Sequence, residues 1–286
     1  MASTTSRERA QAQGRVRWEL LVGLVRKDLK VKYQGSVLGF IWSLANPLLL
    51  LIVYTFVFQV VLKSGIPQFG FYLLSGLLVW NAFSGAVGTS TGAVIGNSGL
   101  VKKVRFPLSV LPLSAVGFAL VHFALQLIVL LVAMTVAGQT QFAGPHLLLA
   151  VPAIGVAVLF TVALSFLVAG LNVRYRDTQH VVEVVLMAGF WVNPIVYSVS
   201  LVQQELGRHH LLWAYFLNPM AGVVTAMQRA LYARNPTLPG GSKVLAADGY
   251  GFYLEKLGIG AVVSLVLLVL GLWVYNRLSA DFAEEL

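Results

Sequence analysis

Cysteine is absent from the 286-residue chain, which excludes disulfide bonds and thiol chemistry. Charged residues are also scarce, at 11% of the chain against about 25% in an ordinary soluble domain. The dipeptide Gly-Lys does not occur, so the chain lacks a phosphate-binding P-loop and cannot hydrolyse ATP by that route. The first 34 residues contain no apolar segment followed by a cleavage site, which predicts that no signal peptide is removed.

Carboxylates are missing from about half of the chain, because no Asp or Glu stands between Asp28 and Asp177. Metal-assisted transfer of sugars or phosphates needs paired carboxylates. Only Asp177 and Glu183 lie near each other in the apolar part of the sequence. We therefore expect neither catalytic residues nor a metal site, and an intramembrane glycosyltransferase or phosphotransferase is disfavoured.

Hydrophobic residues make up 58% of the chain and form long continuous runs. Runs of about 20 apolar residues are typical of transmembrane helices, because a helix satisfies all of its own backbone polar groups in lipid. The sequence predicts an all-α integral membrane protein with a transmembrane domain over 35–286. Its six expected spans cover about 37–62, 71–97, 108–137, 147–171, 181–202 and 256–276.

The segment before the first span predicts a basic amphipathic helix in the membrane interface. Its apolar residues fall on one stripe at helical spacing, and most of its basic residues lie on the other side. The stripe consists of Trp18, Leu21, Val22, Val25, Leu29 and Tyr33. Leu20 and Leu24 lie outside this stripe, so we expect them to contact a partner subunit.

Lys and Arg alternate between the short connections. Eight lie in 1–34, three in 98–107 and two in 172–180, whereas 63–70 holds one and 138–146 holds none. The positive-inside rule then predicts that both termini are cytoplasmic in a multi-pass plasma-membrane protein.

The connection 203–256 carries two short apolar segments that are separated by Asn218-Pro219. Together they are long enough for a seventh span, but proline interrupts a helix and a seventh span would place Arg277 outside. We therefore predict two re-entrant or interfacial half-helices over about 209–233. Asn-Pro also occurs at Asn46-Pro47 and Asn193-Pro194, and each pair is expected to kink a helix.

Two kinds of side chain leave alternatives open. His122 falls within the third span, where it would serve either in a proton relay or, without a carboxylate partner, as a helix contact. His209 and His210 lack metal-ligand spacing and are expected at the surface. Trp80 and Trp191 lie well inside their spans, where they would either face a pore or pack between helices.

These features together resemble the membrane subunits of type-2 ABC exporters for polysaccharides, which move O-antigen, teichoic acid, capsule or galactan chains. The matching segments run in order along the chain. They are the residues 26–47 (RKDLKVKYQGSVLGFIWSLANP), 103–107 (KVRFP), 171–177 (LNVRYRD), 190–197 (FWVNPIVY) and 217–220 (LNPM). The resemblance implies an N-terminal interface helix, six spans, two short outer gate helices before the last span, and a homodimer in the bacterial inner membrane.

The resemblance also implies roles for individual residues. The substrate channel would be lined by Trp42, Tyr54, Phe58, Tyr72, Trp80, Phe83, Trp191 and Tyr197. Beside Leu20 and Leu24, contacts with the ATPase subunit would come from Lys102, Lys103, Arg105, Phe106, Arg174, Arg176 and Asp177. The outer gate would contain Tyr215, Asn218 and Pro219.

The implied partners are two copies of a P-loop ATPase subunit, a second copy of the chain, the lipid bilayer and a polyprenyl-linked polysaccharide. ATP and magnesium would bind to the partner subunit, and this chain would need no cofactor. The function implied is therefore ATP-driven export of a lipid-linked glycan, not an enzymatic activity. The alternative is an ion-driven secondary transporter, which the carboxylate-free stretch disfavours because such transporters need intramembrane acidic residues.

Overall fold

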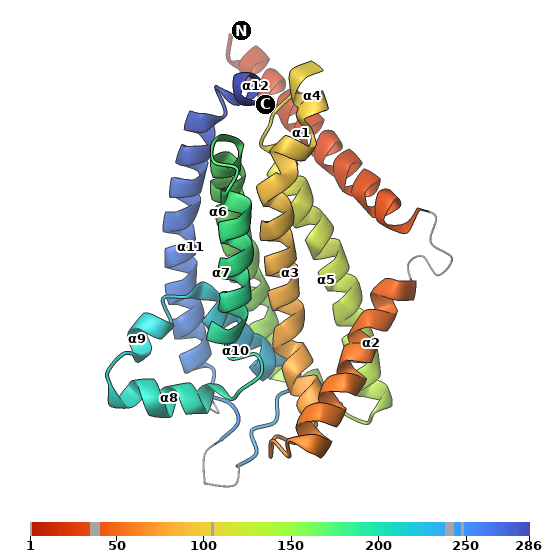
Figure 1. Cartoon of the computed structure of the whole chain (residues 1–286), viewed down its shortest axis with the longest axis vertical. Coiled ribbons are helices and arrows are strands. Elements are labelled where there is room, and N and C mark those ends of the chain that lie inside the picture. Colours follow the sequence, from red (N-terminus) through yellow and green to blue (C-terminus); the bar gives the residue numbers. More distant parts are fainter. Residues whose placement is uncertain (1, 35–40, 104–105, 238–242, 247–248) are drawn as a thin grey trace.

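The computed structural model describes residues 2–34, 41–103, 106–237, 243–246 and 249–286, with side chains from Gly14 onward except those of 41–44, 46, 283 and 284. Helices dominate this part of the chain (Figure 1). In chain order they are α1 (Ala2–Tyr33), α2 (Ile41–Thr55), the π-helix η1 (Phe56–Val61), α3 (Phe69–Gly96), α4 (Ser98–Lys103), α5 (Val110–Val136), the 3-10 turns η2 (Gln141–Ala143) and η3 (Pro145–Leu149), α6 (Ala150–Arg174), α7 (Thr178–Val192), α8 (Val199–Arg208), α9 (Leu212–Tyr215), α10 (Pro219–Leu231), α11 (Gly251–Leu278) and α12 (Phe282–Glu285).

Four helices in the described residues are long and apolar enough to cross a membrane. They are Phe69–Gly96, Val110–Val136, Pro145–Arg174 and Gly251–Leu278, and they match the second, third, fourth and sixth predicted spans. This confirms the all-helical membrane class. Of two shorter apolar helices, Pro47–Val61 falls inside the first predicted span and Thr178–Val192 overlaps the fifth, so the count of six stays a prediction.

The helix predicted over 181–202 is divided in the structure. α7 ends at Val192, and Asn193 takes an extended conformation with φ −86° and ψ 146°. The residue before a proline avoids the helical region because the proline ring crowds it, so the chain leaves the helix at Asn193-Pro194. Pro47, in contrast, lies inside α2, and Pro219 occupies the first turn of α10, where its missing N–H costs nothing.

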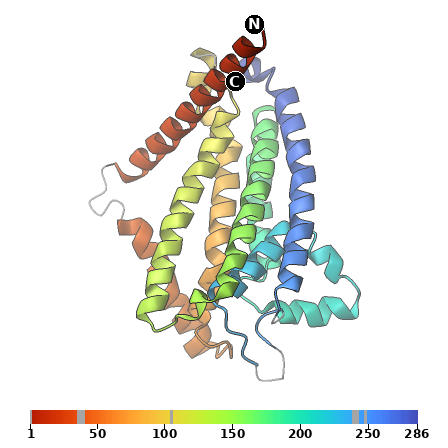
Figure 2. The same ribbon diagram turned by 180° about the vertical axis from the view of Figure 1, so that it is seen from behind.

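The long helices stand side by side as a bundle (Figures 1 and 2). α1 begins and α12 ends at the same end of this bundle, in agreement with the predicted placement of both termini on one side. α4 and the turn between α6 and α7 lie at that end too, which gathers the basic connections there. We call it the basic end. α8, α9 and η2 lie toward the opposite end.

Small residues let α6 and α11 approach closely. A Cβ atom placed on Gly271 would lie 2.5 Å from the backbone oxygen of Ala163, and one on Gly170 would lie 3.2 Å from the Cα of Tyr275. Such contacts between helix backbones are how membrane helices gain van der Waals energy without a hydrophobic driving force. The α6–α11 pair is therefore a fixed element of the bundle.

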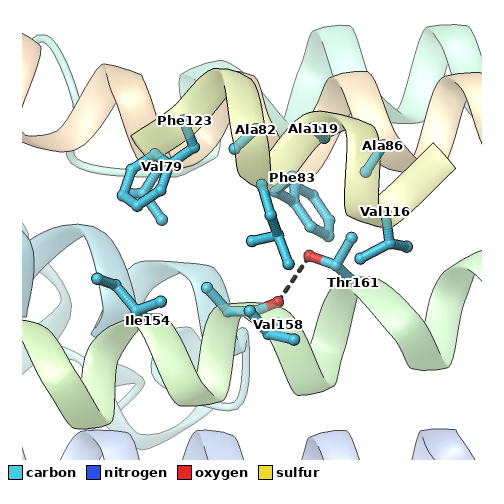
Figure 3. Close-up of a pocket in the computed structure, with 12 residues that line it drawn as sticks. Val79, Ala82, Phe83, Ala86, Val116, Ala119, Phe123, Ile154, Val158 and Thr161 are labelled. Atoms are coloured by element: carbon cyan, nitrogen blue, oxygen red, sulfur yellow. Dashed lines mark hydrogen bonds between the residues drawn. The ribbon is translucent and has the colours of Figure 1, made fainter. Parts of the chain in front are cut away.

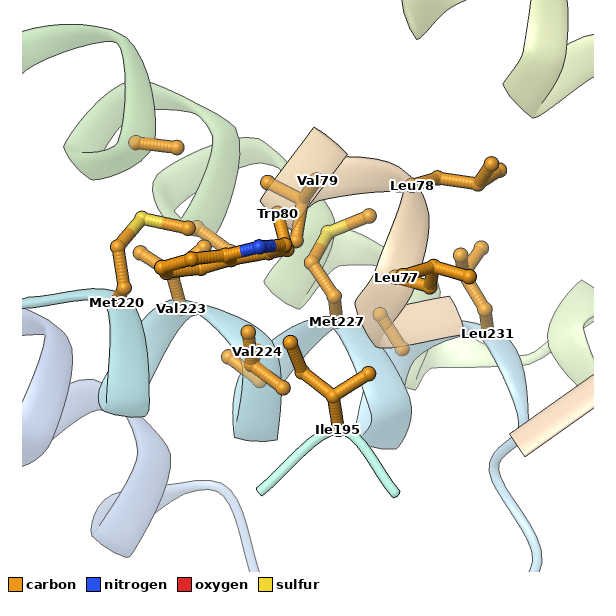
Figure 4. Close-up of a cluster of buried hydrophobic side chains, with 14 of the residues drawn as sticks. Leu77, Leu78, Val79, Trp80, Ile195, Met220, Val223, Val224, Met227 and Leu231 are labelled. Carbon is orange, nitrogen blue, oxygen red and sulfur yellow. The ribbon is translucent and has the colours of Figure 1, made fainter. Parts of the chain in front are cut away.

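α10 is enclosed by its neighbours: among Pro219–Leu231, twelve of thirteen residues are buried, and only Arg229 is partly exposed. The centre of this packing is Trp80 of α3, whose ring lies among Met220, Val223 and Met227 in Figure 4. Gly189 of α7 faces the same ring, since a Cβ there would lie 2.8 Å from Trp80. Trp80 thus joins α3, α7 and α10.

The α6–α11 contact yields a test of the fold. Gly271→Leu should lower the free energy of unfolding by about 2 kcal/mol and the apparent Tm in detergent by about 4–8 °C, because the new side chain meets backbone atoms. Gly258→Leu is the matched control on the same helix, since Gly258 is exposed and a Cβ there meets nothing within 4 Å. Equal melting of the two variants would contradict the close approach.

Candidate functional site

Two Asn-Pro turns meet near the end of the bundle that lies opposite the basic end. The Asn218 Nδ2 atom donates to the Asn193 Oδ1 atom over 3.1 Å, although the two residues lie 25 positions apart. The Asn193 side chain also donates to the Gly189 carbonyl in the last turn of α7 (2.6 Å), and Asn218 Oδ1 accepts from the Met220 N–H as the N-cap of α10 (3.1 Å). This joint, which we call the Asn–Asn joint, ties the end of α7 to the start of α10.

Further hydrogen bonds hold the non-helical segment that follows α7. Gln228 Nε2 donates to the Pro194 carbonyl over 2.7 Å, and the Tyr72 hydroxyl donates to the Tyr197 carbonyl over 2.9 Å. Both side chains are fully buried. Because buried backbone groups must be paired, these bonds allow the chain to leave the helix inside the bundle.

The predicted channel residues divide by exposure. Trp191 is the only exposed ring among the seven whose side chains are described, at 64%; Tyr54, Phe58 and Tyr197 are half-buried. Tyr72, Trp80 and Phe83 are enclosed by this chain, which favours the packing interpretation for Trp80. The side chain of Trp42 lies outside the described part.

The interior between α3, α5 and α6 holds a cavity of about 20 Å³ (Figure 3). Its walls are apolar except for Thr161, whose hydroxyl donates to the Ala157 carbonyl (2.6 Å) and so points no free polar group into the space. A void of this size has room for one water molecule at most and offers it no partners. This cavity within the described bundle is too small for a sugar chain.

α7 presents an apolar face with a polar patch near its N-terminus. Val181, Val184 and Met187 are each more than half exposed on it. Glu183 is exposed among them, with Gln179 donating to its carboxylate over 3.3 Å and the His180 ring 3.8 Å away. A carboxylate facing lipid is costly, so a membrane helix with this surface requires water or another protein beside it.

The residues predicted to contact the ATPase gather at the basic end. Lys102 and Lys103 are exposed on α4, and Arg174, Arg176 and Asp177 are exposed in the turn before α7. Arg105 lies outside the described residues, and Phe106 packs partly against the chain's own core. The two exposed lysines lie in the last turn of the short helix α4.

The two leucines of α1 that are predicted to contact a partner differ in their surroundings. Leu24 is half-buried against the cluster formed by Val94, Leu111 and Phe166, so its predicted contact with a partner stays a prediction. Leu20 is 37% exposed, and its predicted contact with a partner also stays a prediction. The stripe from Trp18 to Tyr33 faces a groove beside α5, because the bundle offers it an apolar surface that the sequence could not reveal.

His122 is a helix contact. Its Nε2 atom lies 2.7 Å from the Tyr33 hydroxyl of α1, and its Nδ1 atom lies 3.2 Å from the Phe118 carbonyl. The Tyr33 and His122 rings are stacked. Both ring nitrogens therefore have partners, and the arrangement fastens α1 to α5. His209 and His210 are exposed, as predicted, and the described residues contain no cluster of three side chains that could hold a metal ion.

Comparison with known proteins gives one family and a consistent set of relatives. Residues 19–232 match the model of the family described as ABC-2 type transporter. The O-antigen export system permease protein RfbA of Myxococcus xanthus is 36% identical over 267 residues, 93% of this chain and 95% of that protein. The RfbA protein of Klebsiella pneumoniae is 33% identical over 272 residues (94% and 95%), and the polysialic acid transport protein KpsM of Escherichia coli is 21% identical over 258 residues (88% and 91%).

The Asn–Asn joint can be tested by a double-mutant cycle. Asn193→Ala and Asn218→Ala should each lower the free energy of unfolding by about 1–2 kcal/mol, through the lost hydrogen bond and, for Asn218, the lost cap. The two effects should fail to add by about 0.5–1.5 kcal/mol, because either variant breaks the same bond. Asn97→Ala, which loses only a bond to Ala93 in its own helix, is the control and should add to both. Full additivity of Asn193→Ala and Asn218→Ala would contradict the joint.

Proposed function

The chain belongs to the ABC-2 type transporter family, and on that premise we propose that it is the membrane subunit of an ATP-driven exporter of a lipid-linked polysaccharide. The observation that carries the proposal is its similarity to O-antigen export permeases over more than nine-tenths of both chains. The cargo is an O-antigen-like or galactan chain on a polyprenyl carrier, moved from the cytoplasm to the outer face of the inner membrane.

ATP hydrolysis belongs to a partner subunit in this proposal. The absence of Gly-Lys removes the P-loop from this chain, and export against a gradient still requires energy. The partner would bind ATP and magnesium and would dock at the basic end. Lys102 and Lys103 on α4, together with Arg174 and Arg176 before α7, offer it exposed cations on two adjacent connections.

The charges support the proposed orientation, and the helix lengths support six spans. The basic end holds α4, the turn before α7 and the start of α1, so the positive-inside rule places it in the cytoplasm. α2 with η1 and α7 with the segment after Asn193 then complete six traverses alongside the four long helices. α10 has thirteen residues and a length of about 20 Å, shorter than a hydrocarbon core of about 30 Å, which supports a re-entrant helix.

Two copies of the chain would form the path for the glycan. The interior cavity of about 20 Å³ cannot admit a sugar, and α7 exposes an apolar face that includes Glu183 and Trp191. Pairing of two chains across α7 would cover the apolar part and leave Glu183 beside water. The Trp191 ring suits a sugar chain because an aromatic face stacks on the apolar face of a sugar without requiring charge.

The outer gate is α9 with α10 and the Asn–Asn joint. Tyr215 is the last residue of α9. Asn218 is the N-cap of α10 and Pro219 is its first residue, beside the end of α7. A shift of α7 would therefore pull on α10 through the bond between Asn193 and Asn218. In this way a movement imposed on the turn before α7 at the basic end would reach the outer mouth.

Deletion of the gene tests the proposed function. Cells without the chain should lose surface polysaccharide and accumulate lipid-linked glycan inside, and the intact gene should restore export. The measurement is surface labelling of the glycan together with extraction of the lipid-linked pool. Restoration should fail when the partner ATPase carries a P-loop lysine-to-alanine substitution. Normal surface glycan in the deletion strain would refute the proposal.

Charge reversal tests the docking surface. Lys103→Glu should weaken association with the partner ATPase subunit by about fivefold, which corresponds to roughly 1 kcal/mol for an exposed ion pair. Lys63→Glu is the control, because Lys63 is exposed in the connection between η1 and α3, on the other side of the bundle. Recovery of the ATPase with an affinity-tagged chain is the readout. Similar recovery with both variants would remove α4 from the interface.

A further inference from the structure

α1 and the bundle enclose a groove that the proposed export function does not use. α1 slants across α5 (Figure 2), and two adjoining hollows of about 530 and 550 Å³ lie between them. Leu29 and Val121 line both hollows, so the two form one continuous groove. Each volume falls within the range of about 300–1,000 Å³ that is typical of binding sites for small molecules.

The groove is kept in place by contacts on either side of its middle. A Cβ atom on Gly117 would come within 2.9 Å of Val25, so glycine permits α1 to touch α5 there. Nearer the C-terminus of α1, Tyr33 bonds to His122, and the Lys32 ammonium lies 5.3 Å from the centre of the Phe118 ring. Because these contacts fix the position of α1, the groove beside them is a feature of the fold.

The walls of the groove are apolar along most of its length. Leu21, Val22 and Val25 of α1 face Leu113, Val116 and Leu120 of α5, and Val158 and Val162 of α6 close the floor. Water has few hydrogen-bond partners on such walls. The groove therefore favours an apolar chain as its occupant.

Two cations stand at this apolar groove. Arg26 lines one hollow and Lys30 lines the other, and both side chains are exposed. They are four residues apart and therefore share one face of α1, where two like charges repel and destabilise the helix. An anion between them would reverse that effect. The position thus combines an apolar slot with a paired positive charge.

The nearby carboxylates do not neutralise this pair. Glu19 bonds to Arg15 over 3.1 Å, and Asp28 lies 3.6 Å from Lys27. Within the described part of the chain, Arg26 and Lys30 have no ion pair or hydrogen bond of their own. From residue 14 to residue 34 the sequence contains six basic residues and two acidic ones, so the excess of positive charge is local.

We propose that this groove binds an anionic phospholipid of the surrounding bilayer. One acyl chain lies between α1 and α5 against the valine and leucine walls, and the phosphate rests between Arg26 and Lys30. The acyl chain gains little by leaving the bilayer, which is equally apolar, so the headgroup charge decides which lipid binds. The site is separate from the exposed α7 face and from the Asn–Asn joint.

The size of the selectivity follows from the two cations. A basic residue near the membrane surface contributes an affinity for anionic lipid of about fivefold, equal to about 1 kcal/mol. Two such residues favour phosphatidylglycerol over phosphatidylcholine by about 25-fold. A phospholipid held in this way would also support α1 along the part of its length that does not touch α5.

Lipid retention by the full-length chain tests the proposal. The protein is reconstituted in nanodiscs made from equal parts of phosphatidylglycerol and phosphatidylcholine, released into mild detergent, and analysed by native mass spectrometry. The unaltered chain should retain phosphatidylglycerol about 25-fold over phosphatidylcholine. The double variant Arg26→Gln/Lys30→Gln should abolish this preference. Arg17→Gln/Lys102→Gln removes two exposed charges that do not line the groove and should retain it.

A second variant separates the contribution of the apolar groove to lipid binding from that of the two charges. Val121→Trp places a large ring where the two hollows meet and should reduce total retained lipid while leaving every basic residue in place. Helix content by circular dichroism identifies any variant that misfolds. Equal retention of the two lipids by the unaltered chain, or an unchanged preference in Arg26→Gln/Lys30→Gln, would overturn the proposal. Preferential retention of added undecaprenyl phosphate over phosphatidylglycerol would also overturn it, since the occupant would then be the glycan carrier.

Discussion

The bundle depends on one constraint, which is that backbone groups freed from a helix inside a membrane must find partners within the protein. α7 ends at Val192, and its chain turns at Asn193-Pro194 instead of continuing as a helix. The side chains of Gln228 and Tyr72 stabilise this turn, because they donate hydrogen bonds to the carbonyls of Pro194 and Tyr197. α10 must then be buried for Gln228 to reach its partner. The short α7, the enclosed α10 and the joint between Asn193 and Asn218 are consequences of the same requirement.

The helices fall into two classes by how they are held. α3, α6, α10 and α11 pack together through small residues and the Trp80 cluster, and backbone approaches such as that at Gly271 leave them little freedom to slide. α1 and α7, by contrast, each touch the bundle along one side and keep a large exposed apolar surface. In the proposed exporter, the closely packed helices would form a fixed frame, and the exposed α7 would be a part that can respond to ATP.

Hydropathy and charge predicted the coarse structure well, because a long apolar run in lipid has almost no alternative to a helix. The four long helices, the common side of both termini and the break at Asn218-Pro219 could be predicted from apolar runs, from the distribution of basic residues and from the position of proline. The pairing of Asn193 with Asn218 was not, since sequence marks a turn but not which other turn it meets. The packing of Leu24 against the bundle could not be predicted for a related reason: helical periodicity gives the relative angle of two side chains, whereas the bundle decides which face is covered. Trp80 and Phe83 show the same limit, because a ring inside a span satisfies packing and channel lining equally well until its neighbours are known.

The groove under α1 has a consequence for biosynthesis. α1 is made before the surface that receives it, which comes from α5 and α6, residues 113–162. At a synthesis rate of about 5–20 residues per second, the helix waits on the order of 10 s before that surface exists. During this interval its stripe from Trp18 to Tyr33 lacks the surface that it faces in the folded chain. Docking of α1 therefore follows the synthesis of α6, which makes it a late step in the maturation of the subunit.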